Sequence, residues 1–236
     1  MVKKASKTTP KEATKIEIPY KWSHNYLGIF EKLSDIRTFD SIIDTLSSTK
    51  YKTLLNCNAT VNINTQREFW KNVTLEKVDK KVVAINSTIK GVKITITCQA
   101  ICEVFELNDL ECKNSFPKTA YQRNFIERGY GEEMKIDTLQ KGSFPSATRF
   151  LFHTLLMCVS NKTTAFNEIP LKIQYLGYAI LQDENFNYSQ VIFNDLVKKC
   201  GENNFFIVSK VFELLLSEKG FQKIMPMYLY RVLLLK

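Results

Sequence analysis

Apolar residues along the chain follow two different periods, and the change between them divides the sequence. Phe39, Ile42 and Leu46 recur every three or four positions, as on the buried face of a helix. From residue 73 to 97, β-branched residues alternate with polar ones around Lys90-Gly91, which predicts an antiparallel hairpin or small meander. After residue 118 the helical period returns. We therefore predict an α+β fold that is predominantly helical, with this small sheet and a C-terminal helical bundle.

Residues that begin and end helices predict the boundaries of these elements. The expected helices begin near Asn64 or Thr65, at Thr97, at Tyr121, at Ser143 or Ser146, near Asn167 and at Ser189, and a last one ends at Gly220. The helix that ends near Ser160 is apolar on almost all sides, which is typical of a helix in the middle of a bundle. Residues 130–144 are polar and contain two glycines, so we expect a mobile connection there.

Composition divides the chain into three regions. Residues 1–15 contain five lysines and one glutamate, which predicts a disordered basic tail. Residues 16–118 are expected to form an α+β region that opens with an extended aromatic arm. Residues 119–236 are expected to be helical, and they can form one continuous domain with residues 16–118.

The net charge is +9, of which the tail supplies +4, so the charge by itself favours a nucleic-acid partner only weakly. Glycine (8) and proline (6) are scarce, which argues against collagen and against a sandwich with many tight turns. The N-terminal residues do not resemble a signal peptide, and no apolar stretch is long enough to cross a bilayer. We therefore expect an intracellular protein, in the nucleus or cytoplasm, with reduced cysteines and no membrane partner.

Several segments, in the same order, resemble one known family. They are EFWKNV (68–73), GVKITI (91–96), FLFHTLLMCVSNKTTAFNE (150–168) and NFNYSQVIFNDLV (185–197). Over about residues 55–220 the chain resembles an uncharacterised domain of plant copia-type LTR retrotransposon polyproteins, which is abundant in the daisy family. This resemblance implies an origin in a mobile element and assigns no chemistry, because the family has no known reaction.

The enzymes of retroelements leave recognisable motifs, and this chain lacks them. There is no Asp-Asp pair for a reverse transcriptase, no Asp-Thr/Ser-Gly for an aspartic protease, and no Cys-Cys-His-Cys cluster for a zinc knuckle. The eight aspartates are scattered and lie mostly at predicted caps and turns, which argues against two-metal catalysis. No glycine-rich phosphate loop is present. We therefore predict a protein that is not an enzyme, with no metal site and no cofactor.

His153 lies on the most apolar predicted helix, five residues before Cys158. A catalytic Cys–His pair would need the two side chains on the same face, and a spacing of five residues places them on different faces. We therefore expect His153 to be a core histidine that is hydrogen-bonded to a neighbouring element.

Two groups of residues are candidates for binding. The first consists of lysines in the tail and along the predicted hairpin: Lys3, Lys4, Lys7, Lys77, Lys80, Lys81, Lys90 and Lys93. These lysines can follow a phosphate backbone, although those of the hairpin equally fit the charges that protect an exposed strand from aggregation. The second group is the aromatic arm, in which Tyr20, Trp22 and Tyr26 can stack on bases or dock a protein.

Two functions from different classes follow from these residues. The preferred hypothesis is a non-enzymatic accessory module, derived from a retrotransposon, that binds nucleic acid nonspecifically through its lysines. The alternative is a module that self-associates or docks a host protein through the aromatic arm and apolar helix faces. An enzyme with an unrecognised site is the third hypothesis.

Overall fold

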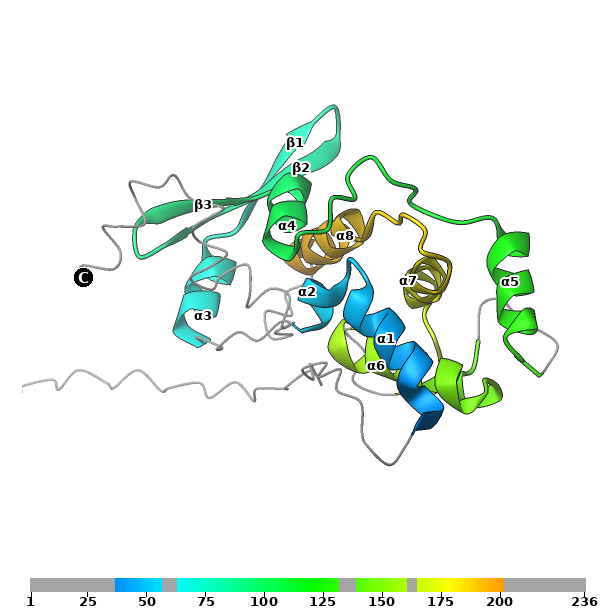
Figure 1. Cartoon of the computed structure of the whole chain (residues 1–236). Helices are drawn as coiled ribbons and strands as arrows, with labels where there is room; N and C mark the ends of the chain where they lie inside the picture. Colours follow the sequence, from blue (N-terminus) through cyan, green and yellow to red (C-terminus); the bar gives the residue numbers. More distant parts are fainter. Residues whose placement is uncertain (1–36, 57–62, 132–138, 161–164, 202–236) are drawn as a thin grey trace, which may run out of the picture.

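The computed structural model describes residues 37–56, 63–131, 139–160 and 165–201. Within these ranges the chain forms eight α-helices and one three-stranded antiparallel sheet (Figure 1), which confirms the prediction of a predominantly helical α+β fold. The basic tail, the aromatic arm and the helix expected to end at Gly220 lie outside the described residues.

The sheet predicted near 73–97 is a meander with strand order β1-β2-β3. Its strands are β1 (Thr74–Val78), β2 (Lys81–Ile89) and β3 (Val92–Ile96). Lys90 and Gly91 have φ angles of 50° and 78°, which suits a two-residue hairpin turn because such turns need two left-handed residues. Asp79 and Lys80 make the same kind of turn without glycine, with φ angles of 49° and 67°. The register between β1 and β2 shifts at Glu76 and Lys77, where a bulge twists the hairpin.

The two faces of the sheet differ in polarity. Ile85 pairs with Leu75 on one side and Ile96 on the other, so these side chains share the face that the helices cover. On the opposite face, Asn86 donates a hydrogen bond to Glu76 (3.0 Å) and accepts one from Thr95 (2.7 Å). The sheet is therefore a half-buried layer with one polar face.

Helix α3 (Ile63–Lys71) packs against β2 and begins one residue before the predicted start. Phe69 is fully buried and Trp70 nearly so. The buried hydroxyl of Ser87, on β2, donates a 2.6 Å hydrogen bond to the carbonyl oxygen of Phe69. These contacts fix α3 against one half of the sheet.

Helices α1 (Asp40–Ser48), α2 (Lys52–Leu55) and α4 (Cys98–Phe105) belong to the first half of the chain. The predicted helical stripe of α1 is confirmed, since Ile42 and Leu46 are buried. Thr97 caps α4 as predicted, and its hydroxyl accepts a 3.1 Å hydrogen bond from the backbone of Ala100. The helix ends at Phe105, because Glu106 takes the left-handed conformation (φ 57°).

Four longer helices follow: α5 (Lys118–Glu127), α6 (Ser146–Cys158), α7 (Leu171–Gln182) and α8 (Tyr188–Gly201). Pro117, Pro145 and Pro170 precede α5, α6 and α7 directly, so proline rather than Tyr121 or Asn167 marks two of these starts. In α8 the predicted cap is wrong. The side chain of Asn187, not Ser189, accepts the capping hydrogen bond from the backbone of Gln190 (2.8 Å).

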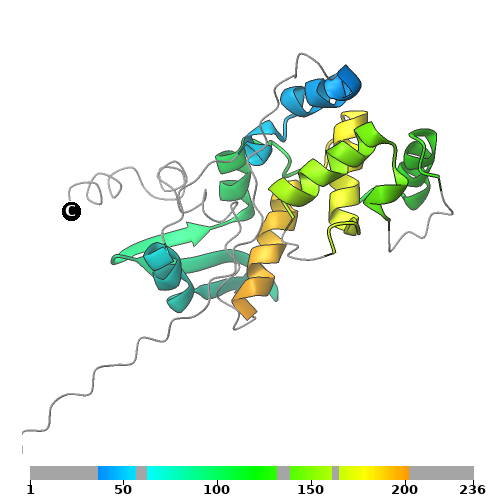
Figure 2. The ribbon, with the colours of Figure 1, turned by 90° about the horizontal axis from the view of Figure 1, so that it is seen from below.

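One hydrophobic core includes residues from both halves of the chain, from Ile42 to Leu196. Figure 2 shows the helices of the second half gathered beside the sheet. Phe152 of α6 lies against Gly177 of α7, where an added Cβ would come within 2.4 Å of the ring. The segment expected to be a mobile connection is fixed at its described end, because Leu139 and Phe144 are buried in this core. No helix in the described part is long and apolar enough to cross a membrane.

Candidate nucleic-acid interface

The five candidate lysines of the sheet are all exposed, and the structure divides them into two groups. Lys77, Lys80 and Lys81 surround the β1–β2 turn, whereas Lys90 and Lys93 lie at the β2–β3 turn. The length of β2 separates the two turns by about 26 Å. The hairpin lysines therefore do not form one surface. Lys3, Lys4, Lys7, Tyr20, Trp22 and Tyr26 lie outside the described residues.

Helix α3 brings two further cations to the β2–β3 turn. The carboxylate of Glu68 accepts a 2.6 Å hydrogen bond from the backbone of Lys90, and the amide of Asn72 donates one to the carbonyl of Thr88 (2.8 Å). These two bonds hold the last turn of α3 beside the β2–β3 turn. Arg67 and Lys71, one helical turn apart, are exposed there.

We call Arg67, Lys71, Lys90 and Lys93 the basic end of the sheet. Lys93 pairs with Thr88 on the polar face of the sheet. Lys71 comes from α3, which covers the opposite, apolar face. The cations therefore lie on both sides of this end of the sheet. The one carboxylate among them, Glu68, is engaged by a backbone N–H. Within the described ranges none of the four cations forms an ion pair. The result is a local excess of positive charge with free donors.

Sequence reasoning missed Arg67 and Lys71. Their spacing of four residues places them on one side of the expected helix, which was a usable signal. What the sequence does not reveal is the pair of hydrogen bonds from Glu68 and Asn72 that holds this helix at the β2–β3 turn.

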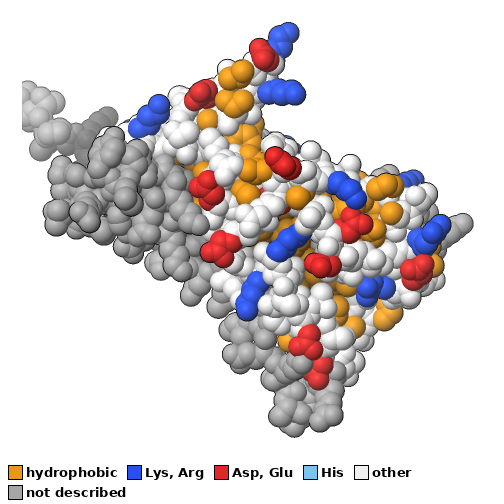
Figure 3. Space-filling view, turned by 45° about the horizontal axis from the view of Figure 1, so that its top comes forward, with side chains coloured by type: hydrophobic (Ala, Val, Ile, Leu, Met, Phe, Trp, Pro, Cys, Tyr) orange, Lys and Arg blue, Asp and Glu red, His pale blue; other side chains and the backbone are white. Residues whose placement is uncertain are grey.

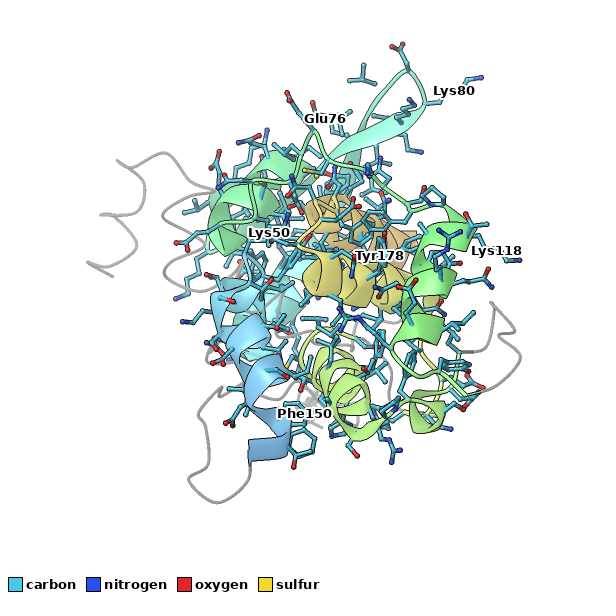
Figure 4. All side chains as sticks on the ribbon, turned by 45° about the vertical axis from the view of Figure 1, so that its right-hand side comes forward. Lys50, Glu76, Lys80, Lys118, Phe150 and Tyr178 are labelled. Atoms are coloured by element: carbon cyan, nitrogen blue, oxygen red, sulfur yellow. The ribbon has the colours of Figure 1, made fainter. Side chains whose placement is uncertain are left out.

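The opposite end of the sheet, residues 77–81, is here called the hairpin tip. It projects beyond the helices, and Figure 4 shows Lys80 pointing away from the body with Glu76 on the same hairpin. Glu76 and Asp79 offset two of its three lysines. Val78 is 54% exposed and Val83, at the bulge, is 41% exposed. Figure 3 shows hydrophobic side chains between charged ones on this projection. This combination fits the lysine-guarded edge strand that was the alternative interpretation.

Aromatic side chains in the described ranges do not offer a stacking surface. Every Phe, Tyr and Trp described there is buried or half-buried. A ligand at the basic end of the sheet would therefore meet cations rather than aromatic rings.

The aspartate that sequence reasoning placed at a turn has a structural role. Asp109 is fully buried, and one carboxylate oxygen accepts hydrogen bonds from the backbone N–H groups of Tyr188 (2.7 Å) and Ser189 (2.9 Å). The other oxygen accepts the hydroxyl proton of Ser189 at 2.5 Å. Asp109 thus satisfies the N-terminus of α8, where a negative charge is stabilised.

Nucleophile chemistry receives no support from the described thiols. Burial, together with the nearby charge of Asp109, raises the pKa of Cys98 to about 11. Burial also raises the pKa of Cys200 to about 11. Neither side chain forms an appreciable thiolate at neutral pH. No group of three or more His, Cys, Asp or Glu in the described ranges could hold a metal ion.

The prediction that His153 lies in the core is wrong, whereas its expected contact with a neighbouring element is present. Its side chain is exposed on α6, and its Nδ1 lies 3.1 Å from the Nζ of Lys141. Cys158 is buried on another face of the same helix, as the spacing indicated. The error arose because the surrounding residues are apolar, although the helix leaves a narrow stripe of its surface uncovered at Arg149 and His153.

Comparisons with known proteins find no match: no family model fits the chain, and no curated protein or solved structure is significantly similar to it.

Proposed function

We propose that this chain is a non-enzymatic nucleic-acid-binding module that contacts the phosphate backbone through the basic end of the sheet. The observation that supports the proposal is the gathering of Arg67 and Lys71 from α3 with Lys90 and Lys93 from the β2–β3 turn. Exposed cations without ion-pair partners release counterions when they bind phosphates, and this drives affinity.

The binding proposed here is independent of nucleotide sequence. Base-specific recognition needs side chains that reach base edges or stack on bases, and the described aromatics are all at least half-buried. The lysines of the tail (Lys3, Lys4 and Lys7) are proposed to add phosphate contacts. An intracellular site of action, in the nucleus or cytoplasm, belongs to the same proposal.

A retrotransposon origin is also proposed, and it rests on the sequence resemblance over about residues 55–220. Two of the resembling segments coincide with α6 and α8, which supply buried residues to the core. The resemblance therefore concerns residues that specify the fold. It does not determine the function, which depends on residues at the surface.

Two matched triple variants test the binding proposal by fluorescence anisotropy of a labelled oligonucleotide at low salt. We expect K71Q/K90Q/K93Q to weaken binding roughly tenfold or more, since each lost phosphate contact removes part of the electrostatic term. K3Q/K4Q/K7Q removes the same charge from the tail and measures how much the tail contributes to oligonucleotide affinity. Two oligonucleotides of unrelated sequence should bind equally. Absence of binding by the unmodified chain would refute the proposal.

A second function, self-association or docking of a host protein, is favoured by the exposed apolar side chains. Val78 lies on the edge strand β1 and Val83 on β2 near the hairpin tip, and Ile126 (57%) and Leu171 (44%) are exposed on α5 and α7. An edge strand with exposed apolar residues can pair with another strand. Light scattering over a range of concentrations tests this function, and a strictly monomeric protein that co-purifies with no partner would exclude it.

A further inference from the structure

A second basic cluster lies on the helical side of the molecule, where α6 follows the short 3-10 helix η3 (Lys141–Ser143). Lys141 places its ammonium 3.1 Å from His153 Nδ1. Arg149 lies one helical turn before His153 and so projects from the same side of α6. Figures 1 and 2 both place α6 apart from α3 and the β2–β3 turn, which form the basic end of the sheet. The cluster is therefore separate from the candidate interface.

The backbone around these three side chains is fixed. The backbone N–H of Lys141 donates to the carbonyl of Asn167 (2.6 Å), and that of Gly142 donates to the Asn167 side chain (2.8 Å). The guanidinium of Arg149 donates two hydrogen bonds to the carbonyl of Phe144, at 3.2 and 3.0 Å. The three basic groups are thus held in place by hydrogen bonds to neutral partners.

Within the described ranges, Lys141, Arg149 and His153 form no ion pair with a carboxylate. Residues 139–160 contain no Asp or Glu. Burial, and then the charge of Arg149, lowers the pKa of Lys141. Burial, and then the charge of Lys141, lowers the pKa of His153. Each basic group therefore makes protonation of the next one harder.

The Lys141–His153 contact also fixes which nitrogen of the histidine carries the proton. A lysine ammonium has donors and no acceptor, so Nδ1 of His153 accepts and Nε2 bears the hydrogen. The ammonium keeps two further N–H donors, and Arg149 keeps guanidinium N–H groups that do not bond Phe144. The donors of two cationic side chains and of the neutral imidazole match the oxygens of one phosphate group.

We propose that Lys141, Arg149 and His153 bind a phosphate group, through a site that is independent of the basic end of the sheet. The phosphate can belong to a free phosphorylated molecule or to a nucleic-acid backbone. In both cases the anion supplies the negative charge that this cluster lacks, and it favours protonation of His153.

Histidine NMR of the full chain tests this proposal, since the chain has only two histidines and H24Q assigns the signals. With inorganic phosphate we expect the pKa of His153 to rise, whereas sodium chloride at the same ionic strength should raise it less. K141Q should weaken phosphate binding about fivefold. K118Q removes the same charge on α5 and should leave binding unchanged. If phosphate acts no differently from chloride, or if K141Q responds like the unmodified chain, the proposal is wrong.

A competing oligonucleotide distinguishes the two sources of phosphate. If the oligonucleotide reproduces the His153 response and displaces inorganic phosphate, the site recognises a backbone phosphate. If inorganic phosphate acts and the oligonucleotide does not, the site recognises a free phosphorylated molecule. Failure of K71Q/K90Q/K93Q to affect oligonucleotide binding would count against the proposed function and would not affect this site.

Discussion

The two ends of the β-sheet carry similar numbers of lysines and differ in everything around them. At the basic end, α3 adds Arg67 and Lys71, and the carboxylate of Glu68 accepts a hydrogen bond from a backbone N–H. At the hairpin tip, Glu76 and Asp79 offset the lysines, and Val78 is exposed. Lysines that look equivalent in the sequence therefore differ in their surroundings. Those of the basic end can bind an anion, whereas those of the hairpin tip protect an edge strand from pairing with another strand.

The largest expected difference between the two ends is in stability. Phe69 is fully buried between α3 and the sheet, so F69A should lower the free energy of unfolding by about 3–5 kcal/mol. V83A, near the hairpin tip, removes a side chain that is 41% exposed, and it should cost less than about 0.5 kcal/mol. Urea denaturation of both variants measures the two free energies of unfolding. Equal losses would show that α3 does not brace the sheet.

A smaller effect is expected from the hydrogen bond that joins α3 to β2. S87A removes one of the two donors to the carbonyl of Phe69, the other being the backbone N–H of Asn72 (3.2 Å), and it should destabilise the protein by about 1 kcal/mol. T88A, one residue further on the polar face, is the matched control and should cost clearly less. A loss in T88A as large as that in S87A would contradict the assigned role of the hydroxyl.

The smallest effect on binding is expected at the hairpin tip. K77Q/K80Q/K81Q should change oligonucleotide affinity by about twofold or less, because neighbouring carboxylates already reduce the local charge. The same variant should increase self-association, since it removes the charges that guard β1 and leaves Val78 and Val83 exposed. Light scattering measures the second effect, and an unchanged monomer would argue against a guarding role.

The sequence was sufficient to predict the elements whose pattern is local. The alternation around Lys90-Gly91 predicted the strands, and the cap at Thr97 predicted the start of α4. Both are confirmed. The position of His153 could not be predicted in the same way, because the exposed stripe of α6 depends on which neighbouring helices cover it. The proline before α7 was a local signal that the preference for an Asn cap concealed.

The candidate interface shows the same limit. Its lysines on the β2–β3 turn were predicted, whereas the contribution of Arg67 and Lys71 depends on contacts of Glu68 and Asn72 with residues about twenty positions away. Long-range hydrogen bonds of this kind leave no periodic pattern in the sequence.

The salt dependence of oligonucleotide binding tests the central claim most directly. Two variants that each lose three lysines, K71Q/K90Q/K93Q and K77Q/K80Q/K81Q, are compared with the unmodified chain between about 50 and 200 mM salt on duplex DNA. The account predicts that the slope of log affinity against log salt falls by about 2–3 for the first variant and by less than about 1 for the second. Equal changes in the two variants, or a larger change at the hairpin tip, would contradict it.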